Sequence, residues 1–138
     1  MAIIQAASCS SADVQTAINQ SSNGDTVLVP SGTCTWTSGV TINKEIIIKG
    51  QTNGCPDNCV DNTVINGDHS LIVQSSNVRV TGITFQGRNI NGDNSGAIFV
   101  HITGGGLSGW RIDHNHFKDI GQTYQSTRAI NVGVYGGM

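Results

Sequence analysis

The side chains best suited to chemistry lie in one short stretch near the end of the chain, between Arg111 and Asp119. On an extended strand, Arg111 and Asp113 point to the same face, and His116 follows beyond an expected corner. Acid–base catalysis needs a side chain that takes up a proton, and an aspartate close to it can hold a metal cation. We therefore predict Arg111, Asp113 and His116 as catalytic candidates, with Arg111 or His116 as the base and Asp113 as a ligand of Ca²⁺. The alternative is an ordinary solvent-exposed polar face.

A second group of polar residues is scattered through turns and loops: Asp61, Asp68, His69 and Asp93. The loop around Asp93 is rich in oxygen ligands, which makes Asp93 a second candidate for Ca²⁺, although the loop lacks the spacing and the bidentate Glu of an EF-hand. A plain surface loop is the alternative.

Two aromatic residues, Trp36 and Tyr124, are candidates for stacking on a sugar ring, with packing in the core as the alternative. Trp110, which precedes an apolar run, is expected in the core. The chain has no serine or cysteine nucleophile motif, phosphate-binding loop or dinucleotide fingerprint.

The four cysteines fall into two local pairs and predict the disulfides Cys9–Cys34 and Cys55–Cys59, one of three possible pairings. Free thiols or a zinc site are the alternatives, although no histidine lies near a cysteine in the sequence. Disulfides form in oxidising compartments, so we expect a secreted or extracellular protein. Residues 1–8 do not form a complete signal peptide.

The composition argues against two classes of partner. The 138 residues carry a net charge of −2 and no run of basic residues, so nothing indicates binding to nucleic acid. No stretch approaches the roughly 20 apolar residues of a membrane-spanning helix. A single domain is expected from the length.

Short apolar runs followed by Gly, Asn or Asp corners recur along the chain, among them residues 27–29, 46–50, 64–67, 71–73, 78–85, 97–100 and 110–112. They are too short for helices and predict strands wound into a solenoid. One helix is expected over residues 10–23, because Ser10 or Ser11 can cap it and Val14, Ala17 and Ile18 form one apolar stripe. This helix would cover the first strands.

Two segments match at an offset of 32 residues: 78–85 and 110–117. If they stack, Arg79 lies beside Arg111, Phe85 lies beside Phe117, and Asn115 can bond to backbone at the corner.

The chain resembles the N-terminal part of the pectate-lyase-like superfamily of right-handed parallel β-helix proteins. The resemblance rests on residues 12–19 (ADVQTAIN) and 24–33 (GDTVLVPSGT), with support from residues 40–42, 46–50, 78–87 and 110–117. It implies a parallel β-helix with a capping helix over 10–23 and coils over 25–138. The superfamily includes polysaccharide lyases, glycoside hydrolases, esterases, phage tail proteins and adhesins, so the resemblance is more specific for a fold than for a reaction.

Two hypotheses about function follow. The first is a secreted, carbohydrate-associated module that resembles polysaccharide lyases, with an incomplete active site if the chain is the N-terminal part of a longer protein. The second is a non-catalytic structural or self-assembling protein, because residues 129–135 are expected to form one more strand without a cap. That uncovered end would associate with another copy of the chain.

Overall fold

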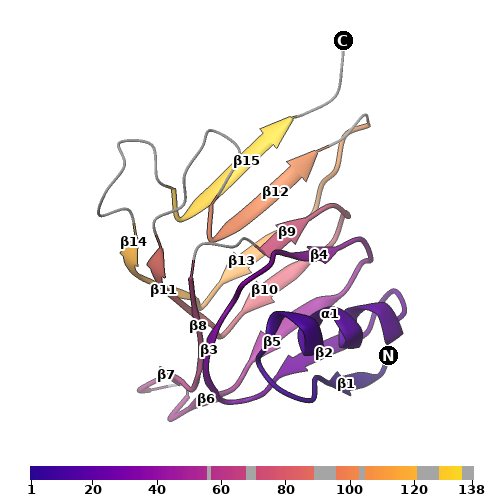
Figure 1. Cartoon of the computed structure of the whole chain (residues 1–138). Coiled ribbons are helices and arrows are strands. Elements are labelled where there is room, and N and C mark those ends of the chain that lie inside the picture. Colours follow the sequence, from indigo (N-terminus) through magenta and orange to yellow (C-terminus); the bar gives the residue numbers. More distant parts are fainter. Residues whose placement is uncertain (56, 68–70, 89–95, 103–104, 121–127, 135–138) are drawn as a thin grey trace.

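Short strands and one helix make up the computed structural model, which describes residues 1–55, 57–67, 71–88, 96–102, 105–120 and 128–134 (Figure 1). The first sheet contains β1 (Ile3–Gln5), β2 (Thr26–Val29), β5 (Ile47–Gly50), β10 (Arg79–Thr81) and β13 (Arg111–Asp113). The second contains β3 (Gly32–Thr35), β8 (Thr63–Asn66), β11 (Thr84–Arg88) and β14 (His116–Ile120). The third contains β4 (Val40–Ile42), β9 (Leu71–Val73), β12 (Ile98–Ile102) and β15 (Ile130–Val134). The short strands β6 (Thr52–Asn53) and β7 (Val60–Asp61) pair as an antiparallel hairpin.

The predicted fold class, a right-handed parallel β-helix forming one solenoid, is wrong. The strands belong to separate parallel sheets of five, four and four strands, and the β6–β7 hairpin interrupts their succession. The spacing between paired residues is also not constant: 21 residues separate Thr26 from Ile47, but 32 separate Ile47 from Arg79. Apolar runs and turn residues specify short strands, whereas the sheet that each strand joins depends on long-range backbone hydrogen bonds.

The helix α1 (Ser11–Gln20) begins where the sequence predicts, at Ser10. The Ser10 hydroxyl accepts a hydrogen bond from the Asp13 amide at 3.2 Å, and Asp13 adds negative charge to the first turn. Val14, Ala17 and Ile18 are buried, as the apolar stripe predicts. The helix therefore has both a defined start and a face that packs on the sheets.

The same helix ends at Gln20, three residues before the predicted end. Ser21 adopts an extended conformation, and its hydroxyl donates to the Ile18 carbonyl at 2.6 Å. The Lys44 ammonium donates to the carbonyl oxygens of Ile18, Asn19 and Ser21 at 3.0, 2.8 and 2.6 Å. These donors satisfy carbonyls that a helix end leaves free, and a cation is favourable there.

The helix α1 packs on the first strands of the molecule and contacts β1, β2 and β4 (Figure 1). The Gln15 side chain accepts from the Thr41 amide at 2.8 Å and donates to the Thr41 carbonyl at 3.1 Å, so it pairs with β4 as another strand would. The disulfide Cys9–Cys34, which the sequence predicts, links the segment before α1 to β3. No helix in the described ranges is long and apolar enough to cross a membrane.

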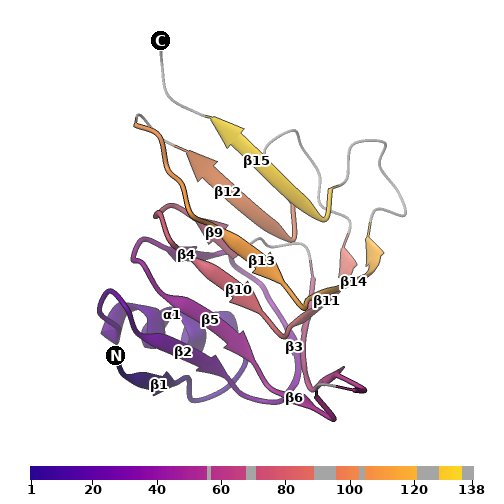
Figure 2. The same ribbon diagram turned by 180° about the vertical axis from the view of Figure 1, so that it is seen from behind.

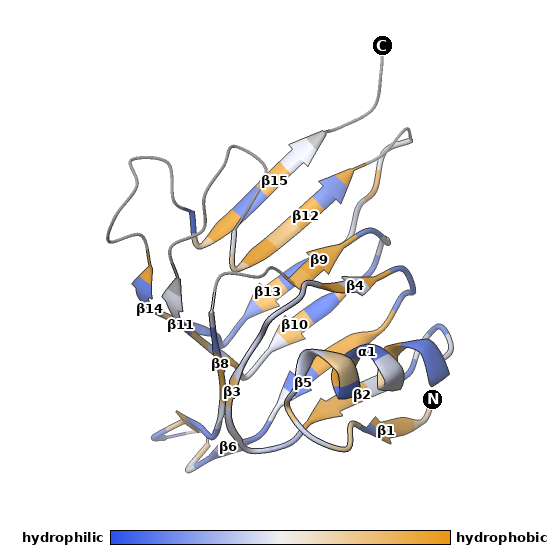
Figure 3. Ribbon diagram, viewed as in Figure 1, coloured by the Kyte–Doolittle hydropathy of each residue, from blue (hydrophilic) through white to orange (hydrophobic). Residues whose placement is uncertain are grey.

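The core lies between the three sheets and α1. Alternate strand residues point inward, and Figure 3 shows that apolar residues follow the strands. Phe85, Ile48, Ile65 and Leu71 are among the residues that are almost fully buried. The predicted 32-residue match is confirmed, because Arg79 pairs with Arg111 and Phe85 with Phe117, whose rings stack at 5.6 Å. One face of the first sheet packs on the core. The opposite face points outward and is turned toward the viewer in Figure 2.

Candidate binding groove on the first sheet

The outward-facing residues of the first sheet line up across its strands. The register places Ile3, Thr26, Ile47, Arg79 and Arg111 in one row and Gln5, Leu28, Lys49, Thr81 and Asp113 in the next. Apolar side chains therefore lie toward β1 and charged ones toward β13. This face offers an apolar surface beside a basic one.

A groove of about 770 Å³ runs over this face, within the usual size range of ligand-binding clefts. The β6–β7 hairpin, held by the disulfide Cys55–Cys59, contributes to its lining, and so does the corner at residues 114–116. Other lining residues include Leu28, Ile47, Lys49, Asp61 and Arg79.

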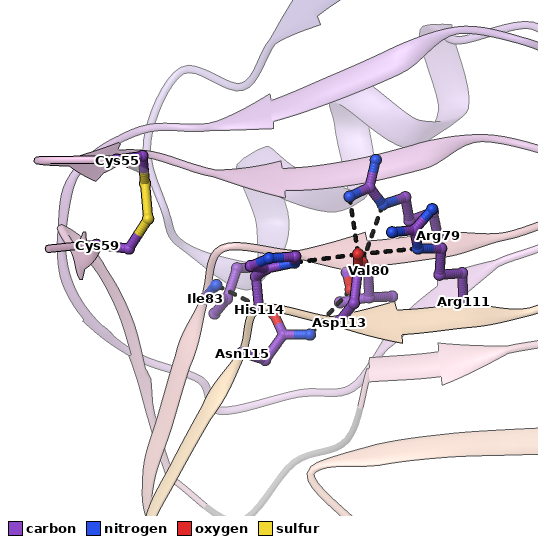
Figure 4. Close-up of polar contacts among 9 residues, drawn as sticks. All are labelled: Cys55, Cys59, Arg79, Val80, Ile83, Arg111, Asp113, His114 and Asn115. Atoms are coloured by element: carbon purple, nitrogen blue, oxygen red, sulfur yellow. Dashed lines mark hydrogen bonds and ion pairs between the residues drawn. A yellow bond between two sulfur atoms is a disulfide. The ribbon is translucent and has the colours of Figure 1, made fainter. Parts of the chain in front are cut away.

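Asp113 binds two arginines, Arg79 on β10 and Arg111 on β13 (Figure 4), and Arg79 also lines the groove. Arg79 donates through Nε and Nη2 to the two carboxylate oxygens of Asp113, at 2.9 and 2.8 Å. Arg111 Nε donates to one of these oxygens at 2.9 Å. The hydrogen bonds from Arg79 hold the pKa of Asp113 well below its usual range, and those from His114 and the charge of Arg111 act in the same direction. Asp113 in turn raises the pKa of Arg79.

His114 occupies a corner position that glycine fills in the neighbouring strands. Lys49, Thr81 and Asp113 are aligned, so the residues that follow them are Gly50, Gly82 and His114. Gly82 has φ +73° and His114 has φ +54°, in the left-handed region that favours glycine. The His114 ring is 66% exposed, and its Nδ1 lies 3.1 Å from Asp113.

Asn115 fixes this corner to the preceding strand. Its side-chain oxygen accepts from the Ile83 amide at 3.1 Å, and its side-chain nitrogen donates to the Val80 carbonyl at 2.9 Å (Figure 4). The predicted bonding of Asn115 to corner backbone is thus confirmed. The histidines on either side of Asn115 are attached to an anchored backbone.

His116, on β14, pairs with a buried carboxylate from the hairpin. Its Nδ1 lies 2.7 Å from the Asp61 carboxylate, which also accepts a hydrogen bond from the Thr84 hydroxyl at 3.0 Å. The Asp61 side chain is 2% exposed, whereas the His116 side chain is 62% exposed. A buried acceptor thus orients an imidazole that remains open to the groove.

The structure brings two of the three predicted catalytic residues into direct contact. Arg111 binds Asp113, whereas His116 lines the groove and binds Asp61 instead. Their catalytic roles stay predictions. Sequence reasoning placed His114 in the polar stretch but assigned it no role, and it missed Arg79 as a site residue. The 32-residue match could have identified both residues, because it aligns Arg79 with Arg111 and His114 with Gly82.

The predicted Ca²⁺ ligands receive no support. Asp93, Asp68 and His69 lie outside the described residues. Both oxygens of Asp113 accept hydrogen bonds from arginines whose charge repels a divalent cation, so its surroundings do not fit Ca²⁺. Within the described ranges, no group of three or more His, Cys, Asp or Glu residues could hold a metal ion.

The aromatic candidates are also accounted for. Trp36 is 3% exposed and its indole Nε1 donates to the Cys9 carbonyl at 2.9 Å, so it is a core residue and not a platform for sugars. Trp110 packs against the core, as expected, and Tyr124 lies outside the described residues. The predicted disulfides Cys9–Cys34 and Cys55–Cys59 are both present, which leaves no free cysteine for a zinc site.

Comparison of the chain with protein-family models, curated proteins and solved structures gives no match.

Proposed function

We propose that this chain is a secreted, carbohydrate-associated protein that binds an acidic polysaccharide in the groove on the first sheet. The two disulfides are compatible with an extracellular protein. One observation carries the proposal: Asp113 holds the guanidinium groups of Arg79 and Arg111 on adjacent strands beside an open groove.

This arrangement leaves donors for a ligand. A guanidinium has five N–H donors, of which Arg79 uses two on Asp113 and Arg111 uses one. The two side chains are 35% and 64% exposed. Paired guanidinium donors match the geometry of a carboxylate, and Lys49 adds a further positive charge from β5.

The apolar part of the groove complements the basic part. Leu28 and Ile47 line it on β2 and β5, and Ile3 adds an exposed side chain on β1. A pyranose ring has an apolar face of C–H groups and a polar rim, so a chain of uronate residues can contact both parts. A short neutral polysaccharide would use only the apolar part.

The test is calorimetric titration with uronate oligosaccharides and with neutral oligosaccharides of the same length. We expect the wild type to bind the acidic series, with an affinity that falls as salt increases. Lys49→Gln and Arg79→Gln, both in the groove lining, should each weaken binding roughly tenfold, which corresponds to about 1.4 kcal/mol. Lys118→Gln, an exposed lysine on β14 outside the groove lining, is the matched control. Equal affinity for both series, or no loss in the groove variants, would contradict the proposal.

A second candidate function, a structural protein that self-associates, is favoured by the last strand of each sheet. β13, β14 and β15 are each at the end of their strand order. On β15, Ile130 is 41% exposed and Val132 is 57% exposed. The outer edge of an edge strand with exposed apolar side chains is a template for association.

Light scattering after gel filtration of the non-reduced protein tests this candidate. A discrete oligomer that Val132→Lys converts to a monomer would support self-association through β15. A wild-type monomer at all concentrations would rule against it.

A further inference from the structure

Two histidines that are separated by one residue line the groove. His114 and His116 flank Asn115, whose side chain holds the backbone between them through Val80 and Ile83. Both rings are mostly exposed, at 66% and 62%. Their position is therefore set by an anchored corner, while the rings themselves face the groove.

Each ring is oriented through the same nitrogen. Nδ1 of His114 lies 3.1 Å from Asp113, and Nδ1 of His116 lies 2.7 Å from Asp61. A carboxylate can only accept, so each Nδ1 carries the donated proton, and the neutral ring presents the lone pair of Nε2. Among the described residues, neither Nε2 atom has a hydrogen-bond partner. A carboxylate that fixes the tautomer of a histidine in this way prepares it for proton transfer.

The backbone conformation of His114 is a further indication that this residue has a functional role. Its left-handed conformation costs a non-glycine residue about 1–2 kcal/mol, and the aligned position in the preceding strand is Gly82. A side chain that breaks a local preference inside a groove suggests a functional reason for its presence.

We propose that His114 and His116 form the proton-transferring pair of the groove, one accepting a proton from the bound polysaccharide and the other donating one to the leaving oxygen. This inference rests on the proposed function and adds a chemical step to it. The described residues that line the groove include no serine, and the two lining cysteines are bonded to each other. The lining thus favours an elimination over a covalent serine or cysteine intermediate.

The step balances without a co-reactant. One imidazole takes the proton from the carbon beside the uronate carboxylate, and the electron pair of that C–H bond forms a C=C bond. The C–O bond to the next sugar breaks, and the other imidazolium protonates the released oxygen. Arg79 and Arg111 would hold the uronate carboxylate and stabilise the charge that develops on it.

The decisive experiment measures cleavage of a uronate oligosaccharide, by the absorbance of the new C=C bond, as a function of pH. The wild type should show a bell-shaped profile. His114→Gln and His116→Gln should each lower the rate by roughly 100-fold or more and remove one limb of the profile, which identifies the acceptor and the donor. His101→Gln, a histidine on β12 outside the groove lining, should leave the rate unchanged. Cleavage that survives in both groove variants would overturn the inference.

A nitrogen-15 NMR spectrum of the wild type tests the geometry without any substrate. Neutral His114 and His116 should both be in the Nδ1–H tautomer, and Asp61→Asn should change the tautomer balance of His116 but not of His114. The Nε2–H tautomer at either histidine would overturn the proposed orientation.

Measurements of binding and of cleavage distinguish the proposed binding function from the proposed roles of the two histidines. If the wild type binds acidic oligosaccharides but cleaves none of them at any pH, the histidine pair is wrong and the binding function stands. If the wild type binds no acidic oligosaccharide, the proposed function fails and the inference fails with it.

Discussion

Among individual residues, Asp113 determines the arrangement of the basic edge of the groove. Its carboxylate accepts from two guanidiniums on adjacent strands and lies beside His114. Without it, Arg79 and Arg111 would lie side by side with no counter-ion between them. Asp113 is therefore better described as a positioning residue than as a ligand of Ca²⁺.

The depressed pKa of Asp113 makes a prediction about stability and pH. A carboxyl group whose pKa is lower in the folded state stabilises the fold above its unfolded pKa, near 4, and this stabilisation is lost as pH falls toward the folded pKa. We expect Asp113→Asn to lower the free energy of unfolding at neutral pH by about 1–3 kcal/mol and to flatten its fall below about pH 4.

Urea unfolding at neutral pH and at several acidic pH values measures this effect. Asp57→Asn, at an exposed position in the hairpin loop, is the control. A variant with the same acid dependence as the wild type would show that Asp113 contributes none of it.

The site also shows which residues sequence patterns can identify. The 32-residue match places Arg79 beside Arg111, because the apolar residues of the two segments align, Val80 with Ile112 and Phe85 with Phe117. It does not reveal Asp61 as the partner of His116, which lies 55 residues away. That contact depends on where the β6–β7 hairpin lies, and no periodicity in the sequence encodes it.

At the level of elements, close approach of β5 and β10 requires a glycine. A Cβ atom on Gly50 would lie against the Gly82 carbonyl oxygen and 2.8 Å from a side-chain carbon of Ile83. Gly50 is buried, so the neighbouring backbone has little room to move. The corner between the first and second sheets therefore depends on the absence of a side chain at this position.

We expect Gly50→Ala to destabilise the protein by about 2–4 kcal/mol, because overpacking against backbone cannot be relieved by a rotamer change. Thermal or urea unfolding measures the loss. The matched control is Gly106→Ala, since a Cβ there meets nothing within 4 Å, and it should change stability by less than about 0.5 kcal/mol. Equal effects of the two substitutions would contradict the close approach.

Elements with strong local signals were predicted well. The cap at Ser10 and the apolar stripe of α1 identify the helix, and apolar runs identify β2, β4 and β9. The strands β1, β3, β6 and β7 were missed, because they are short or polar and form only where a neighbouring strand offers hydrogen bonds. The solenoid was wrong for a related reason: strand patterns do not fix how sheets are divided.

For the molecule as a whole, the two ends of the sheets differ in how they are covered. At the first strands, α1 packs on the sheets and Gln15 pairs with the backbone of β4. A disulfide, Cys9–Cys34, and the Trp36 indole both fasten the segment that precedes α1. The last strand of the third sheet exposes Ile130 and Val132 instead. The helix and the Cys9–Cys34 disulfide thus cover and fasten the end formed by the first strands.

This difference predicts unequal roles for the two disulfides. Cys9–Cys34 closes a loop of 25 residues and Cys55–Cys59 a loop of 4. Loop-closure entropy then gives about 3–4 kcal/mol of stabilisation for the first and about 2 kcal/mol for the second. Replacing each pair by alanine, followed by urea unfolding, tests the order. The Cys55→Ala, Cys59→Ala variant should also bind uronate oligosaccharides more weakly, because its disulfide supports the groove wall. A larger stability loss in that variant than in the Cys9→Ala, Cys34→Ala variant would contradict the prediction.

The alignment of Gly50, Gly82 and His114 has a consequence for how such a protein can evolve. The backbone at His114 has the same positive φ as at Gly82, so the chain follows a similar path at this corner with a side chain in place of the hydrogen. The cost is confined to one residue, and the core residues on either side keep their packing. A corner whose side chain reaches open space, as at His114, can therefore carry a functional group without disturbing the interior, whereas the buried corner at Gly50 cannot.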